Sequence, residues 1–246
     1  MKEPLSVPVT SFSQGFEERI HYSARTFRYL LDSLARPGKV NQLEYPSFFG
    51  QPPCYSTEAT PDGIALNLYA LGALATLLDG ETSFAMVADG RELAQTEQAV
   101  QWLLLRSGSK LATLDTANFV FFCNGGSGGL LSQASLGTLV EPESSATVFY
   151  CVEFLHENTD IILLASGPES GKLRHVELTG PGIQGQRVVS IVGLAEGEIE
   201  FIQATLRNYP LGIDIYLIDR HGRCIGLPRT TRMRIQNNIL PFGEGR

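Results

Sequence analysis

Segments in which apolar residues recur at helical spacing alternate along this chain with short apolar runs of strand length. The clearest helical pattern is formed by four residues at positions i, i+3, i+4 and i+7, which share one helix face: Phe27, Leu30, Leu31 and Leu34. Residues 36–38, Arg-Pro-Gly, then supply a stop signal, because proline and glycine do not continue a helix. Since helical and strand patterns alternate, the sequence predicts an α/β fold built in layers.

The same patterns predict the individual elements. Helices are expected at residues 22–35, 63–78, 91–105 and 196–207. Strands are expected at residues 83–88, 119–123, 147–155, 161–164, 176–179, 188–192 and 210–219. Irregular structure is expected in a leader (1–18), a proline-rich loop (44–62), a flexible glycine-rich joint (124–129) and a flexible tail (236–246). Because there is no internal repeat and no clear linker, we predict a single domain over residues 1–246.

Size and composition exclude several classes of protein. With 246 residues the chain can bury a substantial core, and 43% hydrophobic with 18% charged residues is an ordinary globular composition. A net charge of -7 argues against a general nucleic-acid binder, which would normally carry a basic surplus. The sequence has no apolar run long enough to span a membrane, and its first residues lack the features of a secretory signal. We therefore expect neither nucleic-acid nor membrane partners.

The cysteines and histidines do not form a metal-binding pattern. No CxxC pair occurs among the four cysteines, Cys54, Cys123, Cys151 and Cys224. No two histidines stand at ligand spacing among His21, His156, His175 and His221. Widely spaced cysteines usually act as small buried hydrophobes in a reducing compartment. The sequence thus predicts a cytoplasmic protein without a metal site.

Two short motifs have both a catalytic and a structural interpretation. Ser107 and Lys110 have the S-x-x-K spacing of some acylating serine enzymes, and a lysine there is also a candidate for binding pyridoxal phosphate. The same residues follow a predicted helix end, where they would serve as a stop and a solvated turn. The glycine-rich residues 125–129 follow a strand, as in a phosphate-binding loop, but lack the GK[ST] ending. For these glycines the sequence favours a mobile surface loop.

A cluster of arginines near the carboxyl end is unusual in this acidic chain. A strand predicted at 210–219 is followed by Arg220 and Arg223 in a pattern typical of a hairpin tip. Residues 229–232, Arg229, Thr230, Thr231 and Arg232, then place two guanidinium groups beside two hydroxyls. Such a group suits bidentate recognition of phosphate or carboxylate, or an interface. The alternative is an ion pair with Asp214, with Asp219 or with acids of a partner subunit.

Six segments, taken together and in order, resemble the H subunit (PhnH) family of the bacterial carbon–phosphorus lyase core complex. The segments are residues 27–38, 77–84, 142–147, 178–183, 210–214 and 227–232. Because they extend from the first predicted helix to near residue 234, the resemblance covers most of the chain.

The resemblance, and not the composition, implies fold and function. It implies a three-layer αβα sandwich with a mixed sheet, similar to the pyridoxal-phosphate-dependent transferase fold but without that cofactor. It also implies a homodimer in isolation that joins the G, I and J subunits. That assembly makes α-D-ribose 1-methylphosphonate 5-triphosphate from ATP and an alkylphosphonate, the I and J subunits performing the reactions. The resemblance assigns no catalytic residue to the H subunit. Two alternatives stay open: an autonomous pyridoxal-phosphate enzyme using Lys110, and a phosphate- or nucleotide-binding protein using Arg229 and Arg232.

Overall fold

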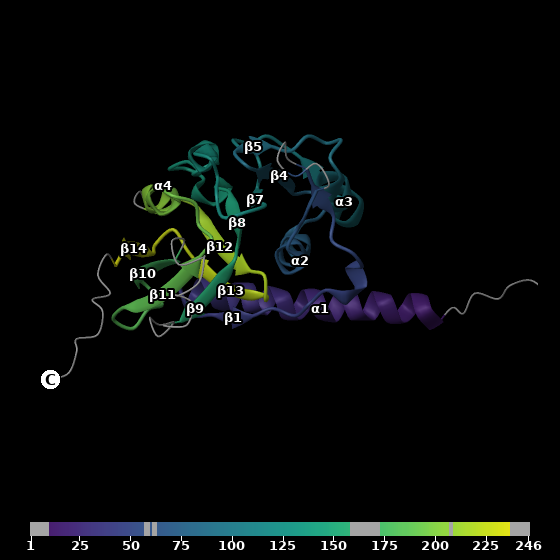
Figure 1. Ribbon diagram of the computed structural model, residues 1–246, viewed down its shortest axis with the longest axis horizontal. Helices are drawn as coiled ribbons and strands as arrows, with labels where there is room; N and C mark the ends of the chain where they lie inside the picture. Colours follow the sequence, from purple (N-terminus) through teal and green to yellow (C-terminus); the bar gives the residue numbers. More distant parts are fainter. Residues whose placement is uncertain (1–9, 57–59, 61–62, 158–172, 207–208, 237–246) are drawn as a thin grey trace, which may run out of the picture.

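A mixed sheet runs through the middle of the protein (Figure 1). The computed structural model describes residues 10–56, 60, 63–157, 173–206 and 209–236, and for residues 10–16 it describes the backbone only. Within these residues the main sheet has eight strands, and four adjacent parallel strands form its centre: β12 (Asp214–Asp219), β8 (Thr147–Val152), β7 (Phe119–Phe122) and β4 (Ser83–Ala88). Both faces of this parallel centre are covered, which explains why its strands are almost continuously apolar.

Shorter strands extend the main sheet on both sides. They are β13 (Arg223–Leu227) and β1 (Asn41–Gln42) beside β12, and β5 (Arg91–Glu92) and β6 (Lys110–Leu111) beside β4. β13 is antiparallel to β12, and the backbone N–H of Gly222 donates to Asp219 in the turn between them. The predicted hairpin tip at 220–223 is therefore confirmed.

One face of the main sheet is covered by three helices, α1 (Thr10–Ala35), α2 (Leu68–Leu77) and α3 (Gln98–Ser107) (Figure 1). Large aromatic side chains of the sheet pack beneath them, among them Phe121 and Phe149. α2 is apolar nearly all round, which is typical of a helix buried on most sides. It begins at Asn67, whose side chain accepts hydrogen bonds from the backbone N–H groups of the first turn.

The other face is covered by α4 (Glu198–Thr205) together with a second, antiparallel sheet. The strands of that sheet, in order, are β14 (Arg232–Ile235), β10 (Leu173–Thr179), β11 (Arg187–Val192) and β9 (Phe154–Glu157). The predicted α/β fold with a mixed sheet is confirmed. This outer layer is not made of helices alone, because along β10 only alternate side chains are fully buried. One face of such a sheet can meet the core while the other stays partly open.

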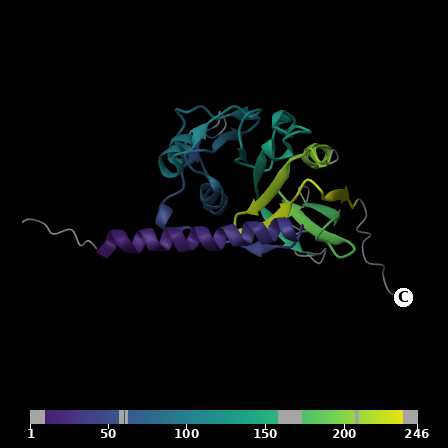
Figure 2. The same ribbon diagram turned by 180° about the vertical axis from the view of Figure 1, so that it is seen from behind.

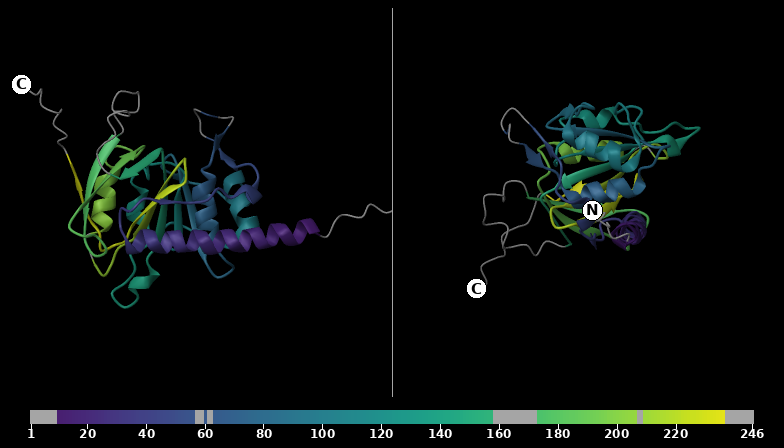
Figure 3. Two further views of the ribbon diagram at one scale, coloured as in Figure 1. Left: turned by 90° about the horizontal axis from the view of Figure 1, so that it is seen from below. Right: turned by 90° about the vertical axis from the view of Figure 1, so that its right-hand side faces the viewer.

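Helix α1 is longer than predicted and buries a different face. It begins at Thr10, within the predicted irregular leader, and its first turns project beyond the rest of the protein (Figure 2). The face that packs on the protein carries Tyr22, Thr26, Leu30 and Ser33, all under 4% exposed. Phe27 and Leu31 are 46% and 52% exposed, so the predicted buried face was wrong for these two residues. The view from below shows α1 lying along the edge of the other layers (Figure 3).

Several other boundaries differ from the predictions. The predicted helix 91–105 is split into β5 and α3, and the predicted helix 63–78 begins with the short strand β3 (Ile64–Ala65). The predicted loop 44–62 contains a short 3-10 helix (Ser47–Phe49) and β2 (Cys54–Tyr55), which pairs with β3. Predictions that lie outside the described residues are the strand 161–164, residues 1–9 of the leader and residues 237–246 of the tail. No helix of the described part of the chain has the length and apolar character needed to cross a membrane.

Candidate functional site

A pocket of about 620 Å³ lies where the four central parallel strands end. The first residues after β4, β7, β8 and β12 all contribute to its lining: Asp89, Cys123 with Asn124, Glu153 and Arg220. Ligands of open α/β sheets bind characteristically at this edge, and the volume is within the range of small-molecule sites. We name this cavity the carboxyl-edge pocket.

The walls of the carboxyl-edge pocket come from the β2–β3 pair and the start of α2. Tyr55 of β2 and Tyr69 of α2 are lining residues, and the Tyr45 ring lies 5.3 Å from the Tyr69 ring in an edge-to-face arrangement. Asn67 fixes this wall to the sheet, because its side-chain amide donates to the Asp219 carbonyl at the end of β12 over 2.8 Å. Aromatic side chains from three segments are thus held around one cavity.

Charged and polar groups hold one another in place at the strand ends. The Asn124 side chain donates to one carboxylate oxygen of Asp89 over 2.8 Å. Glu153 and Arg220 form an ion pair, with the Arg220 side chain 68% exposed. Burial raises the pKa of Tyr55 to about 12, so its phenol stays protonated at neutral pH. Two carboxylates and one guanidinium therefore line the pocket, and only one of the carboxylates has the cation as its partner.

The floor of the pocket includes the thiols of Cys123 and Cys151. Both residues are 7% exposed, and burial raises the pKa of each thiol well above its ordinary value. A thiol with a raised pKa is a poor nucleophile, because the thiolate is the reactive form. The prediction of buried cysteines is confirmed for these two and for Cys224, whereas Cys54 is half-buried. Within the described residues, no group of three or more His, Cys, Asp or Glu side chains has a geometry that could hold a metal ion.

Lys110 lies at the opposite edge of the main sheet. It pairs with Ser83 at the amino end of β4, roughly 17 Å along the strand from the pocket at 3.3 Å per residue. Ser107 donates to a carbonyl of α3, and Ser109 donates to Thr82. Both hydroxyls thus terminate the helix, which matches the structural interpretation of the S-x-x-K spacing. No lysine lines the carboxyl-edge pocket in the part of the chain that the structure describes.

The glycine-rich residues after β7 are packed, so the predicted mobile surface loop was wrong. An alanine Cβ built at Gly125 would lie 1.8 Å from the carbonyl oxygen of Gly193, so two backbone segments meet directly here. Ser127 is fully buried, and its backbone N–H donates to the carboxylate of Glu198 at the start of α4 over 2.9 Å. The other oxygen of that carboxylate accepts from the Tyr150 hydroxyl. The glycines are needed for close approach of backbone to backbone rather than for flexibility.

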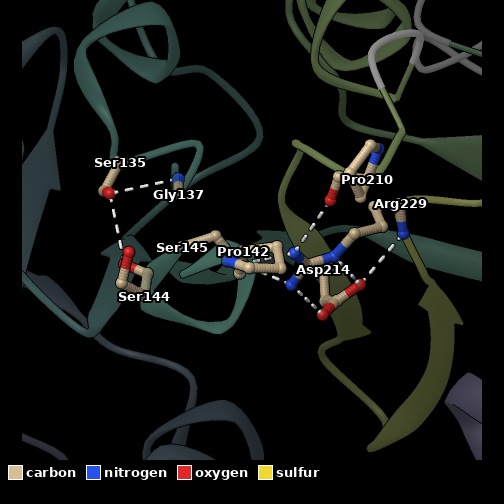
Figure 4. A network of polar contacts seen from close by, with 8 residues as sticks. All are labelled: Ser135, Gly137, Pro142, Ser144, Ser145, Pro210, Asp214 and Arg229. Carbon is tan, nitrogen blue, oxygen red and sulfur yellow. Dashed lines mark hydrogen bonds and ion pairs between the residues drawn. The ribbon is translucent and has the colours of Figure 1, made fainter. Parts of the chain in front are cut away.

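Arg229 is bound within the protein (Figure 4). Its guanidinium forms an ion pair with Asp214 at 2.8 Å, and the two side chains are 17% and 23% exposed. It also donates to the carbonyl of Pro142 over 2.7 Å and to the hydroxyl of Ser145 over 2.6 Å. This geometry corresponds to the internal ion pair that the sequence left as the alternative to anion binding.

The other members of the predicted arginine site line a second cavity, of about 910 Å³. Thr230, Thr231 and Arg232 contribute to it, and Arg234 joins them. Arg232 is exposed on β14, whereas Thr231 is fully buried. The structure thus brings the four predicted residues to one cavity and leaves Arg232 as the arginine of the predicted pair that faces solvent. Anion binding by these residues stays a prediction.

Sequence reasoning missed the carboxyl-edge pocket, although a signal for it exists. Each central strand is apolar and is followed within two residues by a polar or charged residue: Asp89, Asn124, Glu153 and Arg220. Because parallel strands end at the same edge of a sheet, polar residues at these positions must gather there.

The fold and the pocket together define an α/β protein with a ligand-sized cavity at the carboxyl edge of a mixed sheet. The chain belongs to the PhnH family of bacterial phosphonate metabolism proteins, whose family model matches residues 14–234. It is 28% identical over 224 residues to the α-D-ribose 1-methylphosphonate 5-triphosphate synthase subunit PhnH of Rhizobium meliloti (strain 1021), covering 90% of this chain and 95% of that protein. It is 29% identical over 212 residues to the putative C-P lyase subunit protein HtxG of Stutzerimonas stutzeri, covering 85% of each chain. The family resemblance predicted from the sequence is confirmed.

Proposed function

We propose that this chain is an accessory subunit of a carbon–phosphorus lyase complex. It would be needed to form α-D-ribose 1-methylphosphonate 5-triphosphate from ATP and an alkylphosphonate. The observation that carries the proposal is the family match over residues 14–234, together with two relatives named as subunits of such systems. The G, I and J subunits are the proposed partners, and the I and J subunits would supply the reactive groups. The cytoplasmic location stays a prediction from cysteine usage.

A growth experiment tests this proposal. Deleting the gene is expected to abolish growth on methylphosphonate as the sole phosphorus source, because the complex would lack a required subunit. Growth on inorganic phosphate should be unchanged, and an intact copy of the gene should restore growth on methylphosphonate. Normal growth of the deletion strain on methylphosphonate would contradict the proposal.

The proposed homodimer has a suitable surface on α1. Ile20, Ala24, Phe27 and Leu31 are all exposed and stand at spacings of four, three and four residues, the spacing of a helix–helix seam. We call this set the α1 stripe. A seam of this kind can pair with a second copy of itself running antiparallel.

Charges beside the α1 stripe favour the antiparallel arrangement. The stripe is flanked by acidic residues near its amino end, Glu17 and Glu18, and by the exposed cation Arg28 nearer its carboxyl end. In an antiparallel pair the acidic end of one helix lies toward the basic end of the other, whereas a parallel pair would place like charges together. We therefore propose a second copy of the chain as the occupant of the stripe.

Substitution of the stripe tests this interface. The wild-type chain is expected to behave in multi-angle light scattering as a particle of twice its 26.8 kDa mass. Leu31→Asp should shift it to a single chain, because a charge would then be buried in an apolar seam. Leu105→Asp is the matched control, since Leu105 is 84% exposed on α3 and should leave the mass unchanged. A dimer that survives Leu31→Asp would rule out the α1 stripe, and a monomeric wild type would rule out the homodimer.

A further inference from the structure

We propose that the carboxyl-edge pocket binds a purine nucleoside, with the base against the tyrosine wall and the ribose hydroxyls on Asp89. The inference rests on the proposed function, because only in that setting does the protein work beside ATP. It names a ligand class for this subunit, which the family match does not supply.

The wall of the pocket suits a flat aromatic ring. Tyr45 and Tyr69 meet at an interplanar angle of 74°, so they form a corner that presents the face of one ring beside the edge of the other. Tyr55, Leu66 and Leu68 continue this apolar surface. Stacking of a nucleobase on an aromatic side chain is favourable for every base, because each base has a π-face.

The electrostatics of the pocket favour hydrogen-bond donors over a bare anion. Arg220 is paired with Glu153, and Arg91, the nearest cation to Asp89 along the chain, is held by Glu97 at 2.7 Å. One oxygen of Asp89 accepts from Asn124, and the structure gives the other no partner among the described residues. A carboxylate that is held in place and still has free acceptor sites matches the paired hydroxyls of a ribose.

The floor and the mouth fit the remaining parts of a nucleoside. Cys123 and Cys151 present neutral, buried thiols, so the floor neither repels nor requires charge. Arg220 is 68% exposed and therefore lies at the mouth, where a 5′ substituent would leave the pocket. A phosphate ester could meet this guanidinium in solvent, while the base and ribose occupy the cavity.

Calorimetry with adenosine on the purified full-length chain tests the inference. Asp89→Asn is the main variant, since Asn keeps the acceptor for Asn124, tolerates the positive φ of 49° at this residue and removes only the charge. We expect about tenfold weaker adenosine binding, because a charge-assisted hydrogen bond becomes a neutral one. 2′,3′-Dideoxyadenosine should bind the wild type about tenfold more weakly, and Asp89→Asn should not weaken it further.

Tyr45→Ala provides a second, independent variant. It should weaken adenosine at least about tenfold by removing a stacking surface. The matched controls are Asp115→Asn and Tyr209→Ala, at exposed positions outside the pocket, and both should leave binding unchanged. Circular dichroism should show all four variants folded.

Three results would overturn the inference. They are an absence of adenosine binding, adenosine binding that neither Asp89→Asn nor Tyr45→Ala affects, and displacement of adenosine by inorganic phosphate or methylphosphonate, which would define an anion site. The proposed function is separable from this test. Loss of growth on deletion without adenosine binding would overturn the inference alone. Normal growth of the deletion strain with intact adenosine binding would overturn only the proposed function.

Discussion

Replacing Arg229 by alanine is expected to lower the free energy of unfolding by about 3 kcal/mol, because it leaves a largely buried carboxylate without its cation. Asp214 is only 23% exposed and would lose the ion pair at 2.8 Å. The carbonyl of Pro142 and the hydroxyl of Ser145 would lose their donor as well. Urea denaturation followed by circular dichroism measures the effect as a lower midpoint with an unchanged slope.

Arg232→Ala is the matched control for this prediction. Arg232 is exposed on β14, so its replacement should change the free energy of unfolding by no more than about 0.5 kcal/mol. A cycle with Asp214→Asn should show strong coupling to Arg229 and none to Arg232. If Arg229→Ala keeps wild-type stability and instead abolishes anion binding, Arg229 is a ligand-binding residue and the structural role is wrong.

The order of helices and central strands could be predicted because each apolar pattern there reflects one buried face. The predicted single strand 147–155 shows where this fails, since it is two strands in different sheets. At Glu153 the chain leaves the main sheet, and the backbone N–H of that residue donates to Val192 of the second sheet. Both halves are apolar, so nothing in the local pattern marks the change of partner. Strand pairing depends on distant segments, and a single sequence does not display them.

Helix α1 shows a second limit, because its buried face contains polar residues. Ser33 is fully buried yet satisfied, since it donates to the Tyr29 carbonyl and accepts from the side chain of Asn41. The most apolar side of the helix is instead the exposed α1 stripe. A pattern search that equates apolar with buried will therefore choose the wrong face of any helix that carries an interface.

The candidate site divides in the same way. The arginines were visible in the sequence because their charge is unusual, and their ion-pair alternative already named Asp214. The carboxyl-edge pocket was not visible, because its polar residues are spread over 132 positions, from Asp89 to Arg220. Only the parallel order of β12, β8, β7 and β4 brings them to one edge. Such a site becomes predictable once the strand order is known.

The glycine-rich loop after β7 links stability to this pocket, and Gly125→Ala should expose the link. The new Cβ would lie 1.8 Å from the Gly193 carbonyl oxygen and 2.7 Å from its carbon, so one backbone segment must move. Gly193 has little freedom to do so, since it has a φ of +97° and packs against Glu153. We expect a loss of about 3 kcal/mol in the free energy of unfolding, at the upper end of the usual cost of overpacking.

The matched control for Gly125→Ala is Gly80→Ala, where the added methyl group meets no atom within 4 Å. This substitution should change the free energy of unfolding by no more than about 0.5 kcal/mol. Because Asn124 precedes Gly125 and holds Asp89, the displaced loop should also weaken any ligand of the carboxyl-edge pocket. Equal urea midpoints for the two alanine variants would show that the loop yields without cost, and the mobile-loop prediction would then be the correct one.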